Sequence, residues 1–167
     1  MIENRILEYS DKFLTEFNET DVFVIEIPSK TSYEHNGRFV HQVLHERNIK
    51  SDIIIRELSD EEIEEDIIKM REELNNKPFI IVSHISTIDD DNKRNQLVVL
   101  LEKICTKHHI PFIHPMKELT KRGHNIHQLV MPEYRLNHYN DAGHDKISEV
   151  YDDFIHQIMK ALAEAKL

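Results

Sequence analysis

The chain has 167 residues, 40% of them hydrophobic and 31% charged, which is enough apolar content for one folded core, so we expect a single domain over residues 1–167. A formal net charge of −10 argues against nucleic acid or an anionic membrane as a partner, because phosphate binding requires a clustered positive surface. One cysteine, Cys105, excludes an intramolecular disulfide. No secretory leader and no membrane-spanning apolar run are visible, so we expect a cytoplasmic protein.

The first half of the chain predicts two helices and two strands. Residues 3–18 carry apolar side chains at helical spacing. Residues 22–27 form an apolar, β-branched run that ends at Pro28, which predicts a buried parallel strand. After this strand we expect a short helix at 38–47 and a weaker strand at 52–56.

The second half alternates strands with helices. Ser59 and Glu62 have the spacing of a capping box, which predicts the start of a helix. Residues 79–83 are the clearest strand, and a helix with an apolar face that includes Cys105 follows them. Residues 110–114 predict the last strand, and residues 141–163 predict the closing helix. This alternation predicts an α/β fold with a mainly parallel sheet and helices on both faces.

Polar side chains stand at the carboxyl ends of the predicted strands, where open parallel sheets bind their ligands. Ser29, His84 and His114 follow the three clear strands, and we expect them to contribute to a substrate-binding site. The loop that holds His138 directly precedes the closing helix, so it should reach the same edge of the sheet. Glu26 lies inside an apolar strand, where a carboxylate needs a partner such as Lys30, Arg38 or a histidine.

Residues 137–147 are the most informative segment, because His138 stands five residues before Gly143 at the start of the closing helix. This pattern resembles the last block of the SGNH (GDSL-like) hydrolase family. The resemblance implies a flavodoxin-like, SGNH-hydrolase-like sheet. It also implies that His138 is the catalytic general base of a serine esterase, deacetylase or acyltransferase. The substrate would be a small or carbohydrate-bound acyl group.

The chain departs from the family pattern at three places. No Gly-Asp-Ser nucleophile block is present, and the loop at 27–30 lacks the family's oxyanion asparagine. Arg135 stands three residues before His138, where the family has an aspartate, and arginine cannot accept a hydrogen bond from the imidazole. The chain therefore resembles the C-terminal half of the family's domain, and we expect a sheet that is incomplete at the N-terminus.

Two functions from different classes follow from these observations. One is an SGNH-type esterase or acyltransferase, provided that a nucleophile is supplied. The other is a non-catalytic half-domain that acts as a binding or interaction module, and the missing nucleophile block and Arg135 favour it. An incomplete sheet would expose the strand at 21–27, so self-association or a partner chain is expected there.

Each candidate residue also has a purely structural interpretation. Ser29 and Ser83 would then be turn or capping residues, His84 and His114 satisfied histidines, and His138 a polar loop residue. Although the chain has 12 histidines, no His-Glu-x-x-His motif or cysteine cluster accompanies them, so we expect neither a metal nor a cofactor.

Overall fold

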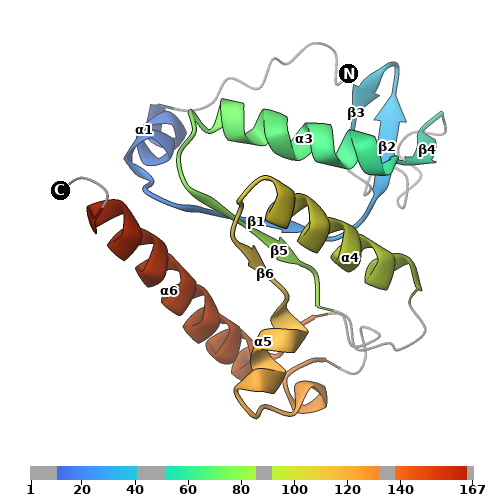
Figure 1. The fold of residues 1–167 in the computed structure, drawn as a ribbon. Helices are drawn as coiled ribbons and strands as arrows, with labels where there is room; N and C mark the ends of the chain where they lie inside the picture. The colour runs from blue at the N-terminus through green and yellow to red at the C-terminus, as the bar shows by residue number, and fades with distance from the viewer. Residues whose placement is uncertain (1–10, 41–51, 86–91, 132–137, 165–167) are drawn as a thin grey trace.

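A three-stranded parallel sheet lies at the centre of the fold (Figure 1). It contains β1 (Phe23–Ile27), β5 (Phe79–Ser83) and β6 (Phe112–Ile113) in the order β1-β5-β6. All three strands lie where the sequence predicts them, although β6 is shorter than expected. The expectation that the strand at 22–27 is buried is wrong, because β1 alternates half-buried with exposed residues, and Val24 and Glu26 are exposed. The computed structural model describes residues 11–40, 52–85, 92–131 and 138–164.

The central strand, β5, is buried along its whole length because its two faces belong to two different hydrophobic cores. Phe79 and Ile81 contribute to one core, and Ile80 and Val82 contribute to the other. A strand that is covered on both faces reads as a continuous apolar run, which is why the sequence identified this one most clearly.

Two long helices cover the first face of the sheet, as Figure 1 shows. They are α3 (Asp60–Glu73) and α4 (Asn92–Lys107), and their buried side chains pack with those of β5. The helix α1 (Asp11–Glu19) contributes Phe17 to the same core, where its ring centroid lies 5.2 Å from that of Phe23.

The opposite face is covered by the C-terminal elements. These are α5 (Pro115–Lys121), the short 3₁₀ helix η1 (Ile126–Gln128) and the closing helix α6 (Asp141–Glu164). Ile147 and Val150 of α6 are buried against this face of the sheet. The prediction of an α/β fold with helices on both faces of a parallel sheet is therefore confirmed.

Two local predictions from the sequence are also confirmed. Glu62 donates its backbone N–H to the Ser59 hydroxyl at 3.1 Å, and its carboxylate accepts from the Ser59 backbone at 2.8 Å, so the capping box forms at the start of α3. Cys105 is buried in α4, and burial raises the pKa of its thiol to about 11, which keeps it protonated and inert.

A second, antiparallel sheet stands at one side of the fold, in the order β3-β2-β4 (Figure 1). It contains β2 (Thr31–His35), β3 (Arg38–Phe39) and β4 (Ile54–Glu57). A tight turn joins β2 to β3, and both of its central residues, Asn36 and Gly37, have positive φ angles of 51° and 71°. Two such residues match the right-handed twist of paired strands, so they favour a hairpin.

This hairpin corrects part of the sequence prediction. The helix expected at 38–47 is wrong at its start, because Arg38 and Phe39 pair with β2 as a strand. The rest of that range, from 41 to 47, lies outside the described residues. The strand expected at 52–56 is present as β4, but it pairs with β2 in the antiparallel sheet rather than joining the parallel one. Of the helix expected at 3–18, the described part begins at Asp11.

Among the described strands, β1 pairs with β5 alone, so it lies at an edge of the parallel sheet. The association of a second chain along this edge stays a prediction. No helix within the described residues is long and apolar enough to cross a membrane.

Candidate functional site

The first contact of the site joins the carboxyl ends of β1 and β5. Glu26 lies opposite Val82 in the parallel register, one strand position before β1 ends. Its carboxylate oxygen Oε1 lies 2.6 Å from Nδ1 of His84, the residue that follows β5. An ionised carboxylate only accepts hydrogen bonds, so Nδ1 of His84 carries the proton in this contact. The expectation that Glu26 has a charged or histidine partner is confirmed.

The second contact brings His138 to this pair. The ring centroids of His84 and His138 lie 6.1 Å apart, and the two rings meet edge to face at 79°. His138 is exposed, whereas only 18% of the His84 side chain is accessible to solvent. The structure therefore places His138 beside His84 at the carboxyl edge of the sheet, the edge that the sequence predicts for it. We call Glu26, His84 and His138 the carboxyl-edge cluster.

Backbone hydrogen bonds hold the loop of His138 against the segment that follows η1. The carbonyl oxygen of His138 accepts from the N–H of Met131 at 2.8 Å, and Tyr139 forms an isolated antiparallel bridge with Val130. These contacts fix the backbone from His138 to Asn140 against the segment that follows η1. His138 is thus presented by a short, locally paired loop.

Asn140 fixes the start of α6, directly after this loop. Its side-chain oxygen accepts from the N–H of Gly143 at 2.9 Å, which is the bond of a helix N-cap. Its side-chain nitrogen donates to the carbonyl oxygen of Gln128 at 2.9 Å, and its backbone N–H donates to Leu129 at 3.1 Å. One side chain therefore sets both the first residue of the helix and its distance from the η1 segment.

The packing around Gly143 explains why the residue five positions after His138 is a glycine. A Cβ atom at this position would overlap the carbonyl oxygen of Leu129 and would lie 3.0 Å from a ring carbon of Tyr139. The backbone of α6 can approach the η1 segment this closely only without a side chain. The glycine therefore acts through packing, which brings the loop to the sheet.

Two tyrosines pack beside the cluster on the face that α6 covers. Burial raises the pKa of Tyr139 far above its usual range, and the phenol of Tyr151 and the charge of Glu26 add to the effect. Burial, followed by the charge of Glu26, raises the pKa of Tyr151 to about 12. Both phenols therefore stay protonated at neutral pH. The Tyr139 hydroxyl is buried and has no hydrogen-bond partner among the described residues.

The structure gives the two strand-end serines a different setting. The Ser29 hydroxyl accepts from the backbone N–H of Thr31 at 2.8 Å, the geometry of a turn serine. Ser29 lines a separate hollow of about 200 Å³ with Lys93 and Arg94, near the start of α4. Ser83 is only 1% exposed, and its hydroxyl has no hydrogen-bond partner in the described part of the chain.

His114 also lies at the end of a strand, where it is the residue before the first turn of α5. Its Nδ1 atom is buried without a hydrogen-bond partner among the described residues. Burial, assisted by the nearby charge of Lys117, lowers its pKa, so the ring is neutral at neutral pH. The structure thus gathers Glu26, His84 and His138, while the predicted roles of Ser29 and His114 in substrate binding stay predictions.

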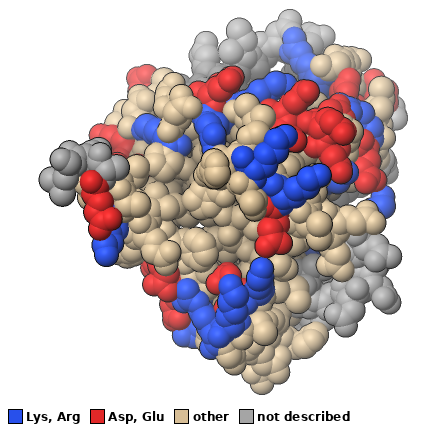
Figure 2. Space-filling view, in the orientation of Figure 1, with Lys and Arg blue, Asp and Glu red and all other residues tan. Residues whose placement is uncertain are grey.

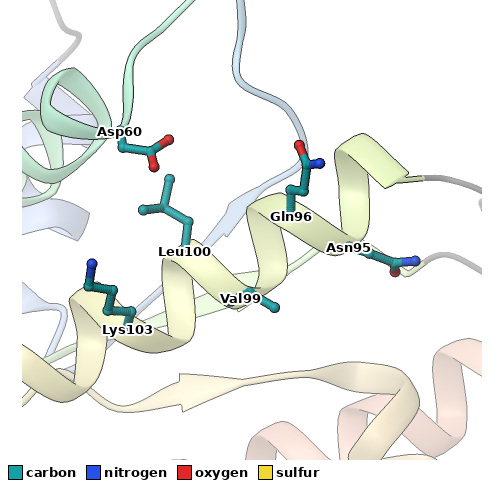
Figure 3. A pocket seen from close by; sticks show the side chains of 6 residues that line it. All are labelled: Asp60, Asn95, Gln96, Val99, Leu100 and Lys103. Atoms are coloured by element: carbon teal, nitrogen blue, oxygen red, sulfur yellow. The ribbon is translucent and has the colours of Figure 1, made fainter.

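A larger hollow lies elsewhere on the surface. It has a volume of about 500 Å³ and lies between the start of α3 and the exposed side of α4. Figure 3 shows Leu100 pointing from α4 toward Asp60 of α3, with Lys103 one turn further along α4. No residue of the carboxyl-edge cluster lines this hollow. Figure 2 shows acidic and basic side chains interspersed on this face.

Among the described residues, no group of three histidine, cysteine or carboxylate side chains is placed to hold a metal ion. Arg135, which stands where the SGNH family has its orienting aspartate, lies outside those residues.

The fold and the carboxyl-edge cluster define an α/β domain with a histidine-rich site at the ends of its parallel strands. The model of one family, the TviD N-terminal domain, matches residues 42–153, which is more than half of the chain. The chain belongs to this family. The matched range contains His84, His114 and His138, but neither Glu26 nor Ser29. No curated protein and no solved structure matches the chain.

Proposed function

We propose that this domain is an SGNH-like hydrolase or acyltransferase that acts on a small or carbohydrate-bound acyl ester at the carboxyl edge of its sheet. The observation that carries the proposal is the edge-to-face contact between His138 and His84. It supports the resemblance because His138 lies on the loop before the closing helix and beside the ends of parallel strands, where such sheets bind ligands. The parallel order β1-β5-β6 between two helical layers supports the finer, flavodoxin-like class.

The chemistry follows from the residue types in the cluster. Acyl transfer begins when a hydroxyl oxygen attacks the carbonyl carbon, and a base must remove the proton of that hydroxyl. Imidazole is suited to this role because its ordinary pKa lies close to neutral pH. We assign His138 this role on the strength of the family resemblance, and we expect Ser29, His84 and His114 to contact the substrate.

We expect turnover by this chain to be slow. The Ser29 hydroxyl is engaged by its own turn, and Ser83 is buried, so neither strand-end serine has the exposed geometry of an activated nucleophile. The same observation favours the second candidate function, a non-catalytic module that binds an acylated carbohydrate at this edge. Both functions predict a ligand at the carboxyl-edge cluster, and they differ only in whether the acyl bond breaks.

One set of measurements tests the proposal and separates the two functions. Hydrolysis of p-nitrophenyl acetate and release of acetate from an acetylated sugar are followed with the wild-type chain and with His138→Ala. The control is His127→Ala, which removes an exposed imidazole from η1, away from the cluster. Turnover that His138→Ala abolishes and His127→Ala keeps supports the enzyme. Binding of the acetylated sugar without turnover, weakened by His138→Ala alone, supports the binding module. Absence of both overturns the proposal.

A further inference from the structure

We propose that His84, held by Glu26, is a catalytic residue of this site and takes over the role of general base that the family resemblance alone gives to His138, so that His84 accepts the proton of the attacking hydroxyl. Glu26 is the positioning residue that orients it. The inference rests on the proposed function, because it assigns proton transfer within the acyl transfer proposed above. It is carried by the contacts of the cluster and involves a residue from β1 that the matched family range does not contain.

The first step concerns the tautomer of His84. A catalytic imidazole works as a base only when one ring nitrogen carries a proton and a third group holds the ring in place. The 2.6 Å contact between His84 Nδ1 and Glu26 Oε1 supplies that third group. Because Nδ1 donates its proton to the carboxylate, Nε2 carries the lone pair. Glu26 would therefore take the role that the resemblance gives to an aspartate, at whose position this chain has Arg135.

The second step concerns access and charge. His84 directly follows β5 and retains 18% of its side-chain surface, so it is held by its surroundings but is still reachable from solvent. The carboxylate of Glu26 stabilises the imidazolium that forms when His84 takes a proton. Among the described residues, His138 contacts the ring of His84, and the charge of Glu26 acts on the phenols of Tyr139 and Tyr151. Both phenols stay neutral, so Glu26 supplies the negative charge within this group.

The reaction step balances with water, or an acceptor alcohol, as the co-reactant. The hydroxyl oxygen of this molecule forms a bond to the acyl carbon while its proton moves to His84 Nε2, and the carbonyl electron pair moves to the carbonyl oxygen. When this tetrahedral adduct collapses, the bond to the leaving alcohol oxygen breaks, and the proton on Nε2 passes to that oxygen. The imidazole returns to its starting state, with the ring of His138 6.1 Å away between centroids.

The test compares two histidine–carboxylate pairs in the same protein. His84→Ala should reduce kcat for p-nitrophenyl acetate by roughly 10²-fold or more, as expected for loss of a general base. The matched control is the pair of His108 and Glu64, whose Nε2 and Oε1 atoms lie 2.5 Å apart at the end of α4. His108→Ala should leave kcat unchanged. Circular dichroism of each variant checks that its fold is kept.

Two readouts separate catalysis from a structural role. Free imidazole added to His84→Ala should restore part of the turnover above the hydrolysis that imidazole itself catalyses, which a reaction without protein measures. A variant that has lost only packing should show no such gain. In Glu26→Gln, kcat should fall more than KM changes.

A third readout does not depend on turnover. Nitrogen-15 spectra of the imidazole should show the His84 proton on Nδ1. A proton on Nε2, or full turnover by His84→Ala while His138→Ala is inactive, overturns the inference but leaves the proposed function in place. A wild-type chain that turns over no ester overturns the proposed hydrolase or acyltransferase activity, and this inference falls with it.

Discussion

Gly143 of α6 lies against the carbonyl group of Leu129 so closely that no side chain fits between them. This contact joins the first turn of the closing helix to the segment after η1, and the loop that presents His138 runs between the two. The spacing from His138 to Gly143 therefore has a physical cause in this fold. The glycine sets how near the loop comes to the ends of the parallel strands.

Gly143→Ala should destabilise the protein, because the new Cβ would overlap the Leu129 carbonyl and the helix would have to move. We expect a loss of about 1–3 kcal/mol in the free energy of unfolding, measured by urea denaturation. The control is Ala142→Gly, which changes a neighbouring exposed position and costs at most about 1 kcal/mol through helix propensity. A Gly143→Ala variant as stable as wild type would contradict the close packing.

Asn140→Ala should cost about 1 kcal/mol, because Gly143 N loses its N-cap acceptor and the Gln128 carbonyl loses its donor. Asn140→Asp is the matched comparison, since it keeps the acceptor for the helix and loses only the donor to Gln128. The order of unfolding midpoints should be wild type, then Asn140→Asp, then Asn140→Ala. Equal midpoints for the two variants would show that the cap contributes little.

The sequence was sufficient to predict the central strand, the capping box at Ser59 and the arrival of His138 at the carboxyl edge. In each case a local rule or a rule of parallel sheets decides the outcome. For Glu26 the sequence predicts only that it has a basic or histidine partner. That the partner is His84 depends on the register of β1 on β5. A shift of one residue in the pairing of β1 with β5 would turn Glu26 to the opposite face of the sheet, and the sequence alone does not determine this register.

The hairpin between β2 and β3 was missed although its signal was present. Asn36 and Gly37 are the residue types that accept positive φ at both central positions of a tight turn. The residues on either side of this turn are polar, so β2 and β3 lack the alternation of apolar residues that usually predicts a strand. The substrate contact predicted for Ser29 stays a prediction, and the structure adds that its hydroxyl accepts from the backbone N–H of Thr31 in the turn.

His114 should make stability depend on pH near neutrality. Burial lowers its folded pKa below the ordinary value of 6.5, so the unfolded chain binds the proton more readily. Its contribution to stability is therefore full above pH 6.5 and falls as pH drops from there toward the lowered folded pKa. Unfolding midpoints measured across this window should fall less steeply for His114→Gln than for wild type. His127→Gln, at an exposed position, should follow the wild-type curve.

Tyr139→Phe should leave stability unchanged or raise it slightly. The hydroxyl is buried and has no hydrogen-bond partner within the described residues, so its removal relieves an unsatisfied polar group while the ring keeps its packing. Thermal unfolding measures the difference. Tyr139→Ala is the comparison, and it should lose several kcal/mol, on the order of 3, because it leaves a cavity in the core. A clear loss in Tyr139→Phe would indicate that the hydroxyl has a partner.

The exposed edge of β1 predicts association with a second copy of the chain. Phe23 donates its N–H toward β5 through the Pro78 carbonyl, so by strand alternation the N–H of Val24 points away from the described sheet. Val24→Pro removes that outward donor without breaking a bond to β5, whereas Val24→Ala trims the same side chain and keeps the donor. Light scattering after size-exclusion chromatography should show a mass that rises with concentration for wild type and Val24→Ala, but not for Val24→Pro. Equal behaviour of the two variants would show that any association occurs elsewhere on the chain. A wild-type mass that never rises would exclude association along this edge.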